Sequence, residues 1–101
     1  MVDNFDRDSH FAEVIAKARS IAEHRLTKLQ DDRREPLSRE QLTSLVDGLA
    51  KEIDLIHRGN VEGFQGQLFG PMKYVIDWGE PNESELLKAL YDIELFYRDN
   101  Y

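Results

Sequence analysis

Residues 38–59 read SREQLTSLVDGLAKEIDLIHRG, and the start, the apolar face and the end of one helix can all be identified in this segment. Ser38 and Gln41 have the S-x-x-Q spacing of a capping box, in which each side chain satisfies a backbone N–H at the start of a helix. Gly59 stands at the other end, where a glycine can adopt the left-handed conformation that terminates a helix. The sequence therefore predicts a helix over residues 38–58.

This helix has an apolar face and a polar face. Its large apolar side chains recur at steps of three and four residues, the repeat of one face of a helix. They are Leu42, Leu45, Val46, Leu49, Ile53 and Ile56. Glu52 and the other charged residues are assigned to the solvated face. Because one apolar face cannot bury itself, the rest of the chain must supply the other side of a core.

A second helix is predicted before it, over residues 9–31, with Ser9 or Asp8 as its cap. Small alanines on its apolar face would let a neighbouring helix approach closely, which favours a compact antiparallel pair. That face consists of Phe11, Val14, Ile15, Ala18, Ile21, Ala22, Leu26 and Leu29. Pro36 disfavours helix at the residue before it, which places the turn between the two helices nearby.

A third helix is predicted over residues 82–98, with Asn82 as its cap. It has two apolar stripes, more than one contact requires. The first is Leu86, Leu90, Ile93 and Tyr97, and the second is Leu87, Tyr91 and Leu95. We expect this helix either to lie between two neighbours or to keep one stripe for a partner.

Residues 60–79 are rich in glycine and in large apolar side chains, so we expect an ordered loop or a short helix. Within it, residues 71–78 fit either a short helix starting at Pro71 or a strand. The short helix is favoured, because nothing else in the chain clearly offers an edge for a strand to pair with. The expected fold is a single all-α domain, residues 1–101, built as a small antiparallel bundle of three main helices.

Composition excludes several classes of protein. The chain is 41% hydrophobic and 33% charged, which argues against disorder, and no apolar run approaches the roughly 20 residues of a membrane span. There is no cysteine, so disulfides, thiolate catalysis and cysteine-based zinc sites are excluded. The N-terminal residues do not resemble a signal peptide. A cytoplasmic location is the default expectation.

The formal charge of −7 is unevenly placed. Residues 59–101 carry eight acids against three Lys or Arg, whereas residues 1–35 carry eight against seven. Nucleic-acid binding depends on neutralising phosphates and is disfavoured by this balance. A basic protein partner is the complementary expectation.

No catalytic residue, metal ligand or cofactor site is predicted. Asp54 and His57 have a D-x-x-H spacing, but a metal site in a helical bundle needs a second such pair, and the sequence has none. The glycines between Gly63 and Gly70 do not match a phosphate-binding loop. An enzymatic function is therefore not favoured.

Residues 19–24, RSIAEH, carry Arg19 and His24 at the spacing of an R-x4-6-H motif. The stretch resembles the motif of the HEPN family of all-helical ribonucleases. The resemblance implies that these two residues would act on RNA across a dimer. It covers six residues, and it lies earlier in the chain than is usual for that family. The competing interpretation is that both side chains belong to a solvated face.

The most function-like feature is the coincidence of acids and aromatics near the C-terminus. Eight of the ten aromatic residues fall from Phe64 onward, in the acidic part of the chain. Aromatic residues anchor interfaces and acids steer basic partners. The candidate partner-binding residues are Tyr74, Asp77, Trp78, Glu80, Tyr91, Asp92, Glu94 and Tyr101. The competing interpretation is that the aromatics fill the core.

Three functions are consistent with these observations. The first is a small binding protein, of the inhibitor or immunity-protein kind, that masks a basic partner. The second is a structural or regulatory helical protein that forms homodimers through Leu87, Tyr91 and Leu95. The third is a HEPN-like ribonuclease.

Overall fold

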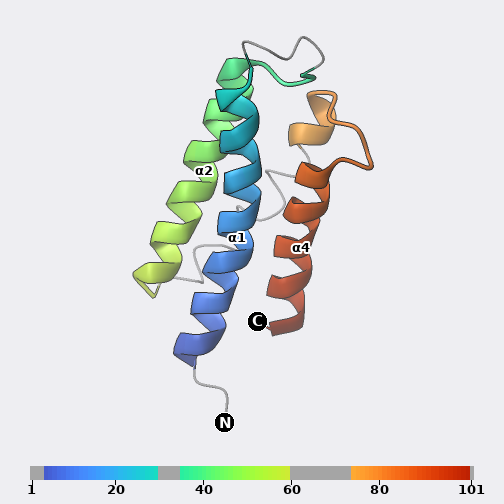
Figure 1. Ribbon diagram of the computed structural model, residues 1–101. Helices are drawn as coiled ribbons and strands as arrows, with labels where there is room; N and C mark the ends of the chain where they lie inside the picture. Colours follow the sequence, from blue (N-terminus) through green and yellow to red (C-terminus); the bar gives the residue numbers. More distant parts are fainter. Residues whose placement is uncertain (1–3, 30–34, 60–73, 101) are drawn as a thin grey trace.

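The computed structural model describes residues 4–29, 35–59 and 74–100, and all regular structure in these ranges is helical (Figure 1). Three long helices are present: α1 (Asn4–Thr27), α2 (Arg39–His57) and α4 (Glu85–Asn100). A short helical turn covers residues 74–77. The predicted all-α class is confirmed.

The helix α1 packs against both α2 and α4. Figure 1 shows α1 running up the molecule while α2 and α4 both run down, so that each is antiparallel to α1. The core residues are fully or almost fully buried and come from all three helices, the segment before α2 and the turn at 74–77. They are Phe11, Ala12, Ile15, Ala18, Ala22, Leu37, Leu42, Leu45, Leu49, Ile56, Val75, Leu86, Leu87, Ala89, Leu90 and Ile93.

Both predicted ends of α2 are confirmed. The backbone N–H of Gln41 donates to the Ser38 hydroxyl at 3.1 Å, and the N–H of Ser38 donates to the Gln41 side chain at 2.8 Å. These two bonds make the capping box complete. At the other end Gly59 has a φ of 76°, and its N–H donates to the Ile56 carbonyl at 2.9 Å.

The predicted starts of the other two helices are wrong. The helix α1 begins at Asn4, earlier than Asp8 or Ser9, because no proline or glycine interrupts the preceding residues. The cap of α4 is Ser84, whose hydroxyl accepts the N–H of Leu87 at 3.0 Å. Asn82 lies instead inside the preceding turn, which is closed by a bond from the Ser84 N–H to the Pro81 carbonyl.

Glu52 does not lie on the solvated face of α2. It is 3% exposed and falls in line with Leu49, three residues before it, and Ile56, four residues after it. The assignment by residue type was wrong because position on the helix decides which side chains face the core. Burial in apolar surroundings raises the pKa of Glu52 from 4.5 to about 7, because the charged form loses its hydration.

The segment before α4 bears on whether residues 71–78 form a short helix or a strand. Residues 74–77 are helical, so a strand over 71–78 is wrong for these residues, and the short helix is confirmed there. The rest of the predicted loop, residues 60–73, lies outside the described residues. The turn at 74–77 is drawn beside the start of α4 in Figure 1.

Candidate interaction surface

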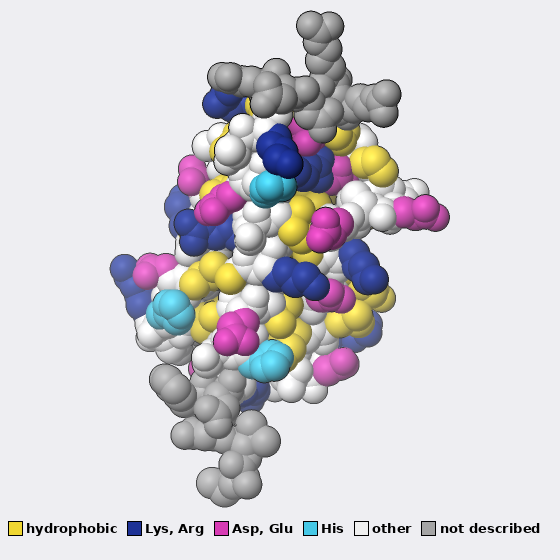
Figure 2. All heavy atoms as spheres, viewed as in Figure 1, with side chains coloured by type: hydrophobic (Ala, Val, Ile, Leu, Met, Phe, Trp, Pro, Cys, Tyr) yellow, Lys and Arg dark blue, Asp and Glu magenta, His cyan; other side chains and the backbone are white. Residues whose placement is uncertain are grey.

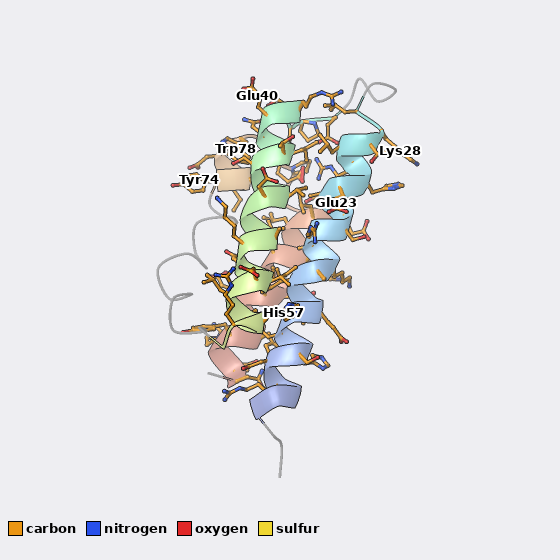
Figure 3. The ribbon with its side chains drawn as sticks, turned by 90° about the vertical axis from the view of Figure 1, so that its left-hand side faces the viewer. Glu23, Lys28, Glu40, His57, Tyr74 and Trp78 are labelled. Carbon is orange, nitrogen blue, oxygen red and sulfur yellow. The ribbon has the colours of Figure 1, made fainter. Side chains whose placement is uncertain are left out.

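Tyr74, Ile76, Asp77 and Trp78 form what we call the aromatic turn. Tyr74 is 58% exposed and Ile76 is 44% exposed, and Asp77 is exposed as well. The rings of Tyr74 and Trp78 stack, with centroids 6.1 Å apart and planes inclined by 21°. Figure 3 shows both side chains on the short helical turn, on the side of the view opposite α1, and the Trp78 ring is half-buried against the core. An apolar surface is thus presented to solvent on a defined piece of backbone.

The backbone of the aromatic turn is closed by two hydrogen bonds. The N–H of Gly79 donates to the Ile76 carbonyl at 3.1 Å, and the N–H of Glu80 donates to the Val75 carbonyl at 3.0 Å. Together with a φ of 105° at Gly79, this is a Schellman stop. The Val75 side chain is fully buried and anchors the turn in the core.

Glu80, which follows the turn, belongs to an ionic cluster of Arg25, Glu35 and Glu80. The guanidinium of Arg25 donates two hydrogen bonds to each carboxylate, including Nε to Glu35 Oε2 at 2.9 Å and Nη2 to Glu80 Oε1 at 2.9 Å. Both carboxylates are almost completely buried. The hydrogen bond to Glu35 is the largest cause of a raised Arg25 pKa, and Glu80 adds to it while burial opposes it.

The ionic cluster connects three parts of the fold. Arg25 lies in the last turn of α1, and Glu80 follows the aromatic turn. Glu35 also accepts the backbone N–H of Leu37 at 3.2 Å, immediately before the cap of α2. Forked guanidinium–carboxylate pairs fix geometry as well as charge, so the cluster holds the ends of these segments in one arrangement.

The structure separates the predicted binding residues into different environments. Glu80 is 4% exposed and engaged with Arg25, so it is not a surface acid. Tyr91 is 47% exposed on α4, whereas Asp92 and Glu94 are half-buried there. No hydrogen bond, ion pair or ring contact between described residues joins these α4 positions to the aromatic turn. Tyr101 lies outside the described residues.

A shallow seam runs between α1 and α4. Figure 2 shows a band of apolar side chains along it, with acidic side chains on the α4 side. Its two grooves are lined by α4 acids spaced seven residues apart: Glu85 in one, Asp92 and Asp99 in the other. Asp92 therefore faces α1, where Lys17 lines the same groove.

The second apolar stripe of α4 is largely used inside the fold. Leu87 is buried and Leu95 is half-buried, which leaves Tyr91 as the exposed member of the three. The burial of Leu87 favours neighbours within the chain over a stripe kept whole for a partner, and among the long helices α4 packs against α1.

Arg19 and His24 are not brought together within one chain. Their separation of five residues places them about 140° apart around a helix with 3.6 residues per turn. The Nε of Arg19 lies 2.8 Å from Glu23 Oε1, while His24 is exposed and lines the upper α1–α4 groove beside Arg25. The two side chains therefore have different neighbours.

The described residues contain no group of three or more His, Asp or Glu side chains arranged to hold a metal ion. Within those same residues, none of the helices is both long and apolar enough to cross a membrane. Comparison with known protein families, with curated proteins and with solved structures finds no significant match.

Sequence reasoning missed the ionic cluster. Its members are 10 and 55 residues apart, and helical periodicity carries no information at that range. One shared signal was present: Glu35 and Glu80 each stand directly before a proline. A residue before proline is biased toward extended backbone, which marks both acids as lying just outside a helix.

Proposed function

We propose that this chain is a small acidic protein-binding module that masks a basic surface of a partner protein, as inhibitors and immunity proteins do. The observation that carries the proposal is the aromatic turn, in which Tyr74 and Ile76 are exposed beside the stacked ring of Trp78. Aromatic side chains are enriched in interfaces, and contact residues that are already ordered lose less entropy on binding.

Charge supports a basic partner. Asp77 and Glu83 are exposed in this region, and Glu85 is exposed at the start of α4. The sequence from Tyr74 to Leu87 contains no Lys or Arg. Such a field attracts a cationic protein and speeds its association, while a second copy of this acidic chain would be repelled.

The experiment compares binding by three forms of the full chain. The three forms are wild type, the double variant Tyr74→Ala with Ile76→Ser, and Tyr91→Ala. Each form is immobilised and used to capture proteins. Any captured protein is then purified and titrated against all three forms. The double variant removes exposed side chains of the aromatic turn, so its folding should be little affected. Tyr91→Ala removes a comparably exposed aromatic from α4 and is the matched control.

We expect a partner of net positive charge whose Kd is weakened about tenfold or more by the double variant and is little changed by Tyr91→Ala. Equal affinity for wild type and the double variant would refute the role of the aromatic turn. An acidic partner would refute the charge argument. Light scattering checks for homodimers, and a dimer abolished by the double variant would assign the surface to self-association instead.

A further inference from the structure

Arg25 bonds to the residue that follows the aromatic turn and is not part of the exposed surface of that turn. The side chain reaches from the last turn of α1 to Glu80, the residue that follows the Gly79 stop. Its other hydrogen bonds go to Glu35, in the segment that leads into α2. Arg25 therefore ties the aromatic turn to the two packed helices.

Among the contacts of Arg25, the one with Glu80 is the contact that holds the aromatic turn in place, and the charges of the ionic cluster show why. Two buried carboxylates share one guanidinium, so the cluster carries a net charge of −1. If Glu80 moved into water, Arg25 and Glu35 would remain as a neutral, forked pair. The docked position of the aromatic turn thus depends on the hydrogen bonds that Arg25 gives to Glu80, in addition to the buried Val75 side chain.

The position of Glu80 is transmitted to the rings through a closed piece of backbone. The bond from the Glu80 N–H to the Val75 carbonyl spans the residues between them, and Trp78 lies inside that loop. Tyr74 in turn stacks on Trp78. We infer that Arg25 is a positioning residue: through Glu80 it holds Tyr74 and Trp78 in the arrangement that binds the partner. The role in partner binding rests on the proposed function, whereas the positioning of the two rings is tested in the free protein.

Trp78 is the only tryptophan of the chain, so intrinsic fluorescence reports directly on the aromatic turn. The variants are Glu80→Gln, Arg25→Gln and Arg25→Lys, with Glu35→Gln as the matched control. Glu35→Gln removes a buried charge from the same cluster but leaves the Arg25–Glu80 contact in place. Far-UV circular dichroism checks that every variant keeps its helix content.

Glu80→Gln and Arg25→Gln should raise acrylamide quenching of Trp78 by roughly twofold, because local release exposes a ring that is half-buried in the docked state. Arg25→Lys keeps the charge but loses the fork, so it should recover part of the protection. Glu35→Gln should quench like wild type. An unchanged signal in Glu80→Gln, or an equal rise in Glu35→Gln, would overturn the positioning role.

The same variants separate this inference from the proposed function. If Arg25 positions the turn, Glu80→Gln should weaken partner binding by about tenfold although Glu80 is buried and cannot touch the partner. One outcome is that quenching of Trp78 rises as expected in the free protein, while the double variant Tyr74→Ala with Ile76→Ser binds the partner as wild type does. That outcome would support the positioning role and refute the binding surface. The reverse pattern would remove the positioning role and leave the binding surface intact.

Discussion

Glu80 and Glu52 are buried to nearly the same extent, at 4% and 3% exposure, but their surroundings differ completely. Glu80 accepts two hydrogen bonds from Arg25. Glu52 lies in the apolar line of α2 and makes no hydrogen bond or ion pair with another described residue, and its pKa rises to about 7. Burial therefore has different consequences for the two carboxyl groups, because a cation lies beside Glu80 and no described cation is paired with Glu52.

The two sites should contribute to stability in opposite ways. A buried acid without a cation must either bind a proton or remain charged in apolar surroundings, and both lower stability at neutral pH and above. A paired acid is compensated, but losing its partner leaves a buried charge alone. Removing the cation of the ionic cluster should therefore be costly, whereas removing the charge of Glu52 should be beneficial.

The largest effect is expected for Arg25→Met. This change leaves Glu35 and Glu80 buried without their cation, which should lower the free energy of unfolding by about 3–5 kcal/mol. Urea denaturation at pH 7, followed by circular dichroism, measures it. The control is Arg58→Met, which removes an exposed pair with Asp54 and should cost less than about 1 kcal/mol. Equal losses in the two variants would show that the ionic cluster behaves like a surface pair.

Glu52→Gln should raise the free energy of unfolding by about 3 kcal/mol at pH 8, the equivalent of the pKa difference between 4.5 and about 7. The folded state binds the proton more tightly than the unfolded state. In the wild type, the stability that comes from the proton bound to Glu52 is therefore fully present below pH 4.5 and is lost as the pH rises through 7.

Urea denaturation of wild type and Glu52→Gln at several pH values between 4 and 8 measures the difference. The two stability curves should be close at low pH and should separate as the pH rises. Parallel curves would contradict the raised pKa. A Glu52→Gln variant less stable than wild type at pH 8 would mean that Glu52 has a favourable partner after all.

A smaller effect tests the backbone between Trp78 and Glu80. Gly79 has a φ of 105°, where a side chain is strained, so Gly79→Ala should destabilise the protein by about 1 kcal/mol or more. Gly48 lies inside α2 with no atom near the place of an added Cβ. Gly48→Ala should therefore stabilise by up to about 1 kcal/mol. Thermal unfolding of both variants measures whether each substitution lowers or raises the stability. A stabilising Gly79→Ala would refute the Schellman stop.

The smallest effect concerns the start of α4, which follows the aromatic turn. Ser84→Ala removes the hydroxyl that accepts the Leu87 N–H and should cost about 1 kcal/mol. Asn82→Ala should be close to neutral, because Asn82 lies in the turn before the cap. Chemical denaturation of the two single variants distinguishes them, and the opposite order would restore Asn82 as the cap.

The features that the sequence predicted are local. The capping box of Ser38 and Gln41 and the stop at Gly59 depend on residues a few positions apart, and both are confirmed. The periodicity of the apolar residues likewise predicted three helices and their buried faces. Where several polar residues compete for one cap, as Asn82 and Ser84 do, only the path of the backbone decides, and the prediction was wrong.

The features that the sequence did not predict depend on tertiary contacts. Glu52 has the composition of a surface residue and the position of a core residue, and residue type was the weaker guide. The pairing of Arg25 with Glu80 joins residues 55 positions apart, so it follows from the packing of α1 against the rest of the bundle. Glu80 was therefore assigned to the exposed surface, although it is buried and accepts hydrogen bonds from Arg25.

A double-mutant cycle of Arg25 and Glu80 tests whether these two buried side chains depend on each other. The free energies of unfolding of Arg25→Met, Glu80→Met and the double variant are compared with wild type. Because Arg25→Met leaves Glu80 as an unpaired buried charge and the double variant does not, the double loss should be smaller than the sum of the single losses by about 2 kcal/mol. Losses that add within about 0.5 kcal/mol would contradict the account, because the two residues would then be independent.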